Sequence, residues 1–275
     1  MMIEILKVVL FGIIEGITEW LPISSTGHLI ILEEYINVTS IFKGGKQFWD
    51  FFLVVIQLGA ILAVIVCYYD KLMIFSNNKE QRNNSIKMWS KIIVACLPAA
   101  IMGLLLDDFL EEKLYNYVTV SLMLILYGFI FIVVEMINKK RKIRINSITQ
   151  MSYKIAFFIG IFQVLSLIPG PSRSGVTILG AMILFCSRDV ACEFSFFLAI
   201  PIMVGATLLK MVKYFLNNQI IITDLFLLGI GIIVSFLVSI VIIKWLLKYV
   251  KSKDFKIFGF YRIVLGIVLI LIKVL

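Results

Sequence analysis

The sequence predicts an all-α, polytopic membrane protein made of two inverted-topology repeats. Of its 275 residues, 61% are hydrophobic and only 16% are charged. Apolar runs of about 20 residues recur, which is the length needed to cross a bilayer core of ~30 Å. The charged residues cluster between these runs instead of covering a soluble surface. We expect a single integral membrane domain over residues 1–275, with repeat 1 at about 1–137, a basic cytoplasmic linker at about 138–151 and repeat 2 at about 152–275.

Two pairs of shorter apolar segments are predicted to form re-entrant helix–loop–helix units. They cover residues 3–14 with 28–36, and about 153–168 with 175–186. At a rise of 1.5 Å per residue, none of these segments spans the membrane. Each pair flanks a polar stretch that contains proline, so each is expected to enter and leave on one side. Non-helical backbone at that depth is tolerated only where it is buried in protein or lines a wet cavity.

Six full crossings are predicted between and after these pairs. They lie at about 48–68, 88–106, 117–137, 191–212, 222–246 and 257–274. Each half therefore holds one re-entrant pair and three crossings, and because three is odd, the second half must be inverted relative to the first.

The two halves also resemble each other in sequence. A shift of 148 residues places Gly12 on Gly160, Glu15 on Gln163, Thr18 on Ser166, Ser24 on Ser172, Thr26 on Ser174 and Gly27 on Gly175. Inverted repeats with broken helices place their working site near the midplane, where the repeats meet. We expect the two polar loops to face each other there.

The charges of the loops predict the orientation. Segments 70–91, 138–154 and 244–256 hold 5, 6 and 5 Lys or Arg residues, whereas the 107–113 connection is mainly acidic. The positive-inside rule makes the basic segments cytoplasmic. Both termini and the mouth of the first re-entrant pair are then outside. Because the net charge of +9 resides in these segments, we expect no nucleic-acid partner.

The first polar loop contains two carboxylates and the only histidine of the chain. Glu15 and Glu19 are spaced i, i+4, so on a helix they share one face. Two buried carboxylates this close do not both ionise comfortably unless a cation binds between them. Oxygen ligands with room for water and phosphate suit Mg²⁺ or Ca²⁺. The structural alternative is that one glutamate pairs with Arg173 and the other stays protonated.

Three hydroxyls follow the acidic pair, at Ser24, Ser25 and Thr26. Any one of them could cap the next helix, but three exceed what one cap requires. A serine near His28 could be a nucleophile activated by that base. The alternative for a lone histidine is a structural role.

The second polar loop, 169–175, has Arg173 between Ser172 and Ser174. Glycines let a backbone approach an anion, and the following helix presents free N–H groups. The arginine fork matches phosphate oxygens. An unpaired arginine between apolar half-helices is expensive, so an anionic partner is implied.

Four other polar residues lie in or beside the predicted spans. Gln57 is equally compatible with lining the cavity and with bracing helices, and Glu193 is expected to brace or to lie at the interface. Tyr261 and Arg262 open the last span, where interfacial anchoring is expected.

The two loops resemble a known pair of motifs. Glu-Gly-x-Thr-Glu-x-Leu-Pro-x-Ser-Ser-Thr-Gly-His, with Pro-Gly-x-Ser-Arg-Ser-Gly downstream, is similar to the signature pair of the bacterial undecaprenyl-diphosphatase family, also called bacitracin-resistance proteins. The resemblance covers the whole length, since Phe-Ser-Phe-Phe-Leu-Ala-Ile-Pro at 194–201 and the closing Tyr-Arg stretch also match.

This resemblance implies a multi-pass enzyme of the bacterial plasma membrane whose active site faces the outer side. It would hydrolyse undecaprenyl diphosphate to undecaprenyl phosphate with a divalent cation, and so confer bacitracin resistance. By position, Glu19 with Glu15 would bind the metal or act as base, Ser25 would be the nucleophile, His28 the base or acid, and Arg173 the phosphate ligand. The expected substrate-binding positions are Ser24, Thr26, Gly27, Gln57, Gly170, Ser172, Ser174 and Gly175.

The isoprenoid tail of the substrate is expected to lie among membrane lipids, against the short helices. The rival function is a transporter that carries a polyprenyl phosphate across the bilayer through the same midplane site. The sequence leaves three points open: whether Ser25 forms a phospho-enzyme or positions water, which divalent metal is used, and whether the chain forms a homodimer.

Overall fold

The computed structural model describes residues 1–114 and 116–274, without the side chains of residues 107–112 and 274. The described chain is helical throughout, apart from turns and one isolated β-bridge between Ile145 and Cys186. In chain order the helices are α1 (Met2–Thr18), α2 (Ser25–Tyr35), α3 (Gly45–Val55), α4 (Gln57–Cys67), α5 (Tyr69–Leu72), α6 (Lys79–Leu114), α7 (Tyr117–Asn138), η1 (Ile148–Gln150), α8 (Tyr153–Val164), η2 (Leu165–Leu167), α9 (Arg173–Ile183), α10 (Arg188–Asn217), α11 (Ile222–Ser252) and α12 (Lys256–Val274).

Five helical segments within the described residues are long and apolar enough to cross a membrane. They are Gly45–Cys67 (α3 with α4), Lys79–Leu106 of α6, Tyr117–Asn138 (α7), Arg188–Asn217 (α10) and Ile222–Ser252 (α11). The sixth predicted crossing forms a helix, α12, but it carries Lys256, Arg262 and Lys273 and is not among the five. The acidic connection expected at 107–113 falls mostly on side chains outside the described part. The chain is therefore an all-helical polytopic membrane protein.

Large apolar side chains point outward along the long helices, as expected where lipid replaces water. On α6, Leu104 is 79% exposed, and Phe129 on α7 and Val241 on α11 are 55% and 64% exposed. A soluble protein of this size would hide such residues, because contiguous exposed apolar surface promotes association.

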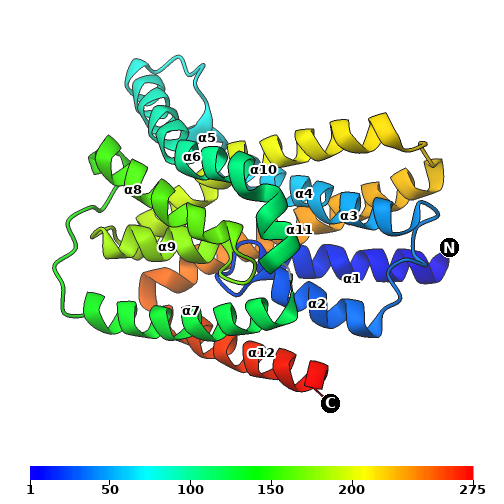
Figure 1. Cartoon of the computed structure of the whole chain (residues 1–275). Coiled ribbons are helices and arrows are strands. Elements are labelled where there is room, and N and C mark those ends of the chain that lie inside the picture. The colour runs from blue at the N-terminus through cyan, green and yellow to red at the C-terminus, as the bar shows by residue number, and fades with distance from the viewer. Residues whose placement is uncertain (115, 275) are drawn as a thin grey trace.

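The two short helix pairs open at opposite ends of the molecule, and their turns meet near its middle (Figure 1). At the end where α1 begins, the backbone N–H groups of Lys43 and Gly44 donate to the Asp224 carboxylate at 3.0 and 2.7 Å. At the other end, the N–H of Arg144 donates to the carbonyl oxygen of Phe185 at 3.1 Å. Backbone contacts thus join neighbouring loops at each end of the molecule.

Close helix contacts hold the pairs in place. The first helix of each pair packs on a long helix of the other half, α1 on α11 and α8 on α6. A Cβ atom built at Gly160 of α8 would lie 2.3 Å from the Ala95 carbonyl oxygen of α6, so only glycine permits this approach. Where α7 crosses α12, a Cβ at Gly128 or at Gly259 would each meet the other glycine's oxygen at 2.7 Å. Small residues at such crossings are typical of membrane helices.

Buried ionic contacts tie the helix ends together at the basic end of the molecule. Glu135 of α7 is 1% exposed and accepts from Arg188 Nε and Nη2 at 2.9 and 2.6 Å. The same carboxylate accepts from the backbone N–H of Phe255 at 2.9 Å, just before α12 begins. This one side chain therefore joins α7, α10 and α12.

Candidate active site

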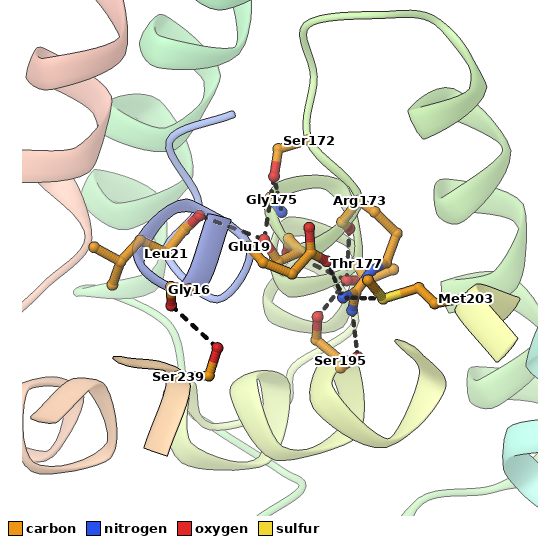
Figure 2. Close-up of polar contacts among 11 residues, drawn as sticks. Gly16, Glu19, Leu21, Ser172, Arg173, Gly175, Thr177, Ser195, Met203 and Ser239 are labelled. Atoms are coloured by element: carbon orange, nitrogen blue, oxygen red, sulfur yellow. Dashed lines mark hydrogen bonds and ion pairs between the residues drawn. The ribbon is translucent and has the colours of Figure 1, made fainter. Parts of the chain in front are cut away.

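The turn after α1 and the start of α9 lie near the middle of the molecule (Figure 1), and their side chains come together there (Figure 2). Glu19 follows the last residue of α1, and Arg173 is the first residue of α9. Arg173 Nη2 donates to Glu19 Oε1 at 2.5 Å, and the two side chains are only 12% and 10% exposed. This contact confirms the prediction that the two polar loops face each other.

Helix α10 supplies further partners that fix the Arg173 guanidinium. Its Nη1 donates to the carbonyl oxygen of Ser195 at 2.7 Å, and its Nη2 approaches the Met203 sulfur at 3.5 Å (Figure 2). The guanidinium lies 5.7 Å from the centre of the Trp20 ring, which packs edge-on against Phe196. The buried Nε of Arg173 has no partner among the described atoms. The Nε–H is thus left for a ligand.

Glu15 lies one turn before Glu19 and keeps the predicted helical spacing, because the N–H of Glu19 donates to the Glu15 carbonyl oxygen at 3.0 Å. Glu15 is 2% exposed, and its Oε1 has no hydrogen-bond partner among the described atoms. A buried, unpartnered carboxylate oxygen is costly, so it fits a cation or a proton. The described residues contain no cluster of three or more His, Cys, Asp or Glu side chains that could hold a metal. The chain therefore offers two carboxylates, and a cation would need further oxygens from water or substrate.

The structural alternative for the acidic pair is partly realised, since Glu19 does pair with Arg173. The other half of that alternative, a protonated Glu15, fits the unpartnered buried oxygen as well as a bound cation does. At the position that the internal repeat matches to Glu15, Gln163 is 1% exposed, and neither its Oε1 nor its Nε2 has a partner within the described chain. Both halves thus bury a polar group without satisfying it, which is unusual away from ligand sites.

Ser24 and Ser172 are the residues that turn the backbone into α2 and α9. Both have positive φ angles, 73° and 67°, in a region that non-glycine residues rarely adopt. Each side chain caps its helix by accepting from the N–H three residues on, at Gly27 and Gly175, both at 3.4 Å. Strained caps of this kind concentrate at functional sites. They aim the N-termini of two helices, with their free N–H groups and positive dipole ends, at the region between the turns.

The hydroxyls of Ser25 and Thr26 lie in the first turn of α2, and both residues are partly exposed. Within the described chain, neither hydroxyl donates to His28 or to a carboxylate. His28 Nδ1 instead lies 2.7 Å from the Ser24 carbonyl oxygen, and its Nε2 lies 2.7 Å from the Tyr261 hydroxyl. The structure therefore does not bring the predicted nucleophile and base into contact. Such contacts often tighten only with substrate bound.

A chain of hydroxyls lines the α9 side. Ser172 Oγ and Ser174 Oγ are 3.1 Å apart, and Ser174 Oγ donates to the Leu21 carbonyl oxygen at 3.5 Å, which joins the two turns again. Thr177 Oγ1 lies 2.7 Å from Ser195 Oγ. Sequence reasoning missed Thr177 and Ser195, because single hydroxyls inside apolar helices carry no distinctive signal.

Arg262 corrects one expectation. It was predicted to be an interfacial anchor, but its side chain is completely buried. Nη1 donates to the Pro22 carbonyl oxygen at 3.1 Å, and Nη2 donates to those of Gly170 and Pro171 at 2.9 and 2.8 Å. One arginine side chain thus links the two turns through hydrogen bonds to their backbone carbonyl oxygens. The guanidinium also lies 5.8 Å from the centre of the Tyr127 ring, where cation–π attraction offsets part of its desolvation.

The other predicted residues are placed as follows. Gly27 and Gly175 are buried in the first turns of their helices, and Gly170 has a φ of 110° that favours glycine. Gln57 begins α4 and makes no hydrogen bond to either turn in the described part of the chain, so the structure does not join it to the site. Glu193 accepts from Lys71 at 2.6 Å, which fits both of its predicted roles, a bracing group and an interfacial charge.

Comparison with known proteins places this site in a family. The model of the family described as "Bacitracin resistance protein BacA" matches residues 8–268. A protein of Acetivibrio thermocellus named undecaprenyl-diphosphatase is 50% identical over 273 residues, which cover 98% of this chain and 98% of that protein. Proteins of the same name from Enterococcus faecalis and Streptococcus mutans are 50% and 51% identical, over 98% and 99% of this chain and 97% and 98% of their own lengths. The chain belongs to the bacitracin resistance protein BacA family.

Proposed function

We propose that this protein is an undecaprenyl-diphosphatase, which hydrolyses undecaprenyl diphosphate to undecaprenyl phosphate and inorganic phosphate. Relatives that are 50% and 51% identical over nearly the whole chain carry this name. The structural observation behind the proposal is the contact of Arg173 with Glu19, beside Glu15. The oxygens of a diphosphate need cationic partners, and carboxylates near them serve when they hold a divalent cation. The two turns provide an arginine fork and two such carboxylates.

Arg173 is the phosphate ligand in this proposal. In the substrate-free protein, Glu19 neutralises the guanidinium, and the terminal phosphate competes with Glu19 for the same N–H groups. The free Nε and the N-termini of α2 and α9 add donors for the phosphate oxygens. The walls of the pocket are then formed by small and hydroxyl-bearing residues of both turns, namely Ser24, Thr26, Gly27, Gly170, Ser172, Ser174 and Gly175.

Glu15 and Glu19 are the proposed holders of a divalent cation, Mg²⁺ or Ca²⁺. The support is the unpartnered Glu15 oxygen and the hard oxygen chemistry of the two carboxylates. When bound, the cation would neutralise charge on the diphosphate oxygens. Two protein ligands leave most of its coordination to water and substrate, which is usual for Mg²⁺ at phosphate sites.

The proposed chemical step is an in-line displacement at the terminal phosphorus. The oxygen of Ser25, or of a water held beside it, forms a new bond to phosphorus as the bond to the bridging oxygen breaks. His28 accepts the proton of the attacking hydroxyl, and the leaving group is undecaprenyl phosphate. If Ser25 attacks, water then hydrolyses the phosphoserine. Positioning and charge neutralisation provide most of the acceleration in such reactions.

The membrane arrangement in this proposal is an inverted repeat with two re-entrant pairs, α1–α2 and α8–α9. Support comes from the strained serine caps 148 positions apart and from the reciprocal packing of α1 on α11 and α8 on α6. We place the basic end in the cytoplasm of a bacterium and the mouth of the α1–α2 pair outside. Substrate would then enter sideways from the outer leaflet, with its tail among lipids. A homodimer stays a prediction that the mass of the detergent-solubilised particle would check.

A transporter of polyprenyl phosphate is the alternative. It is favoured by one observation, that the two helix pairs open at opposite ends and meet in the middle (Figure 1), because transporters build their binding sites in this way. Transport of an anion needs no nucleophile or acidic pair, so we rank it second.

The test is phosphate release from undecaprenyl diphosphate by detergent-purified protein. Wild type is compared with the variants Arg173→Ala, Ser25→Ala and Glu19→Gln, with and without EDTA, followed by return of Mg²⁺ or Ca²⁺. Glu193→Gln is the matched control, because it breaks an ion pair outside the site. We expect release that depends on the cation, falls in the three site variants and persists in the control.

Other outcomes decide between the mechanisms. Substantial release by Ser25→Ala alone would replace the serine nucleophile with water. No release by folded wild type, across several cations and tail lengths, would overturn the phosphatase. Transfer of labelled polyprenyl phosphate between the leaflets of proteoliposomes would then support the transporter.

A further inference from the structure

We infer that Tyr261 is a positioning residue that holds His28 in one tautomer and one orientation for the reaction. This inference rests on the proposed function, in which His28 accepts a proton. Tyr261 lies on α12 and His28 on α2, 233 residues apart in sequence. Sequence reasoning gave Tyr261 only an anchoring role at the membrane interface.

The hydrogen bonds of His28 fix which nitrogen carries the proton. Nδ1 lies 2.7 Å from the Ser24 carbonyl oxygen, and a carbonyl oxygen only accepts, so Nδ1 must carry a hydrogen. In the neutral ring Nε2 is then an acceptor. The Tyr261 hydroxyl, 2.7 Å away, must therefore donate to Nε2. The basic nitrogen of His28 is therefore Nε2, and its lone pair points at the Tyr261 hydroxyl.

The same partners also suit the protonated ring. Because the Tyr261 hydroxyl occupies the Nε2 lone pair, the proton of the attacking hydroxyl reaches Nε2 by relay. Tyr261 passes its own hydrogen to Nε2 and takes up the incoming one, and its phenol oxygen then accepts from the Nε2–H. Nδ1 continues to donate to Ser24. His28 can therefore change its charge without changing its partners, so little reorganisation accompanies proton transfer.

The rings of the two residues reinforce this orientation. They stack with centroids 5.6 Å apart and planes 10° apart. Tyr261 is 44% exposed, so its hydroxyl could be solvated in other rotamers, yet here it points to His28. Ser24, which carries the carbonyl partner, is also the strained cap of α2. His28 is thus oriented between the active-site turn and α12.

The contact can be measured directly because His28 is the only histidine of the chain. Protein labelled with ¹⁵N-histidine gives one pair of imidazole nitrogen signals, with no need for assignment. We expect Nδ1 to be protonated and Nε2 to show the shift of an unprotonated nitrogen that accepts a hydrogen bond. Tyr261→Phe keeps the ring but removes the hydroxyl, and should move the Nε2 signal toward that of a free nitrogen. Tyr153→Phe is the control, since Tyr153 is 49% exposed and its hydroxyl lies 2.8 Å from Ser90 Oγ, away from the site.

Kinetics test whether the contact serves the reaction. Loss of one hydrogen bond that orients the base should lower kcat of Tyr261→Phe by about tenfold, with KM within about twofold of wild type. The same substitution in a His28→Gln background should cost nothing further, because Tyr261 acts through His28. Tyr153→Phe should retain wild-type kcat.

Each departure from this pattern overturns the inference in a distinct way. An unchanged Nε2 signal in folded Tyr261→Phe would show that the hydroxyl does not hold His28. A shifted signal with unchanged kcat would show that the contact does not serve the reaction. An equal loss in the His28→Gln background would place the effect elsewhere. If wild type releases no phosphate, the proposed function fails, whereas the nitrogen signal still decides whether Tyr261 holds His28.

Discussion

Arg173 is bound on three sides in the substrate-free protein, by Glu19, by the Ser195 carbonyl oxygen and by the Trp20 ring. Glu19 lies where the phosphate of the substrate would bind. Its negative charge neutralises the guanidinium and keeps the arginine in position until substrate arrives. Buried ion pairs add little stability by themselves, but removal of one partner is costly because the other charge remains. Loss of activity in a charge-removing variant therefore has to be separated from loss of fold.

Arg173→Lys makes that separation. Lysine keeps the positive charge near Glu19 but lacks the planar fork that binds phosphate through two N–H groups. We expect a small change in thermal unfolding and at least a tenfold loss of kcat/KM, measured as phosphate release, since charge-assisted bonds contribute about 1.5–3 kcal/mol each. Arg173→Ala should instead destabilise the protein by about 3–5 kcal/mol, because Glu19 is left buried and unpaired.

The matched control is Arg188→Lys, which changes an arginine bound to buried Glu135 at the far end of the molecule. It should lose stability but keep its activity while folded. Wild-type kcat/KM in Arg173→Lys would contradict a phosphate-binding role for the fork.

At the scale of helices, the site depends on how two turns are held against each other. Neither turn has regular backbone hydrogen bonds throughout, and Arg262 supplies donors to carbonyl oxygens of both. The glycine contacts of α8 and α12 set how closely these helices approach their neighbours. Helices that carry no proposed catalytic group thus determine the geometry of the active site.

Arg262→Met tests the role of this arginine. Methionine fills similar apolar space but leaves the carbonyl oxygens of Pro22, Gly170 and Pro171 without their donor. Each unsatisfied buried acceptor costs about 1–3 kcal/mol, so we expect a clear drop in unfolding temperature, followed by tryptophan fluorescence. We also expect a fall in kcat for the fraction that stays folded. Arg262→Lys should be intermediate, because one ammonium group cannot span both turns. Wild-type stability in Arg262→Met would contradict the clamp.

Gly160→Ala tests the close contact of α8 with α6. Its Cβ would lie 2.3 Å from the Ala95 carbonyl oxygen, so the helices must separate. Overpacking of this kind costs about 1–3 kcal/mol, and the loss should appear as a lower unfolding temperature. Gly229→Ala on α11 is the control, since nothing lies within 4 Å of its Cβ and alanine favours a helix. Equal stability of the two variants would contradict the close contact of α8 with α6.

For the whole molecule, the sequence predicted most features that local patterns encode. Short apolar segments around polar turns, the i, i+4 glutamates and the contact of the two loops follow from length, spacing and the internal repeat, and the structure confirms them. Arg262 could not be predicted in this way, because an arginine near the start of an apolar helix looks like an interfacial anchor until its distant carbonyl partners are known. The contact of His28 with Tyr261 was missed for the same reason, since it joins α2 to α12. Ser25 and His28, the predicted nucleophile and base, share a turn of α2, but within the described chain His28 bonds instead to Ser24 and Tyr261.

Cysteine labelling tests the orientation of the molecule. Exposed Thr39 lies in the loop between α2 and α3, and exposed Lys140 lies between α7 and η1, at the other end. If the basic end is cytoplasmic, a membrane-impermeant maleimide should label Thr39→Cys in intact cells but label Lys140→Cys only after permeabilisation. Wild type controls for its own four cysteines, two buried and two partly exposed. The reverse pattern would place the mouth of the α1–α2 pair inside. Substrate would then have to approach from the cytoplasmic leaflet, and only a protein that also moves its lipid across the membrane could serve the outer one.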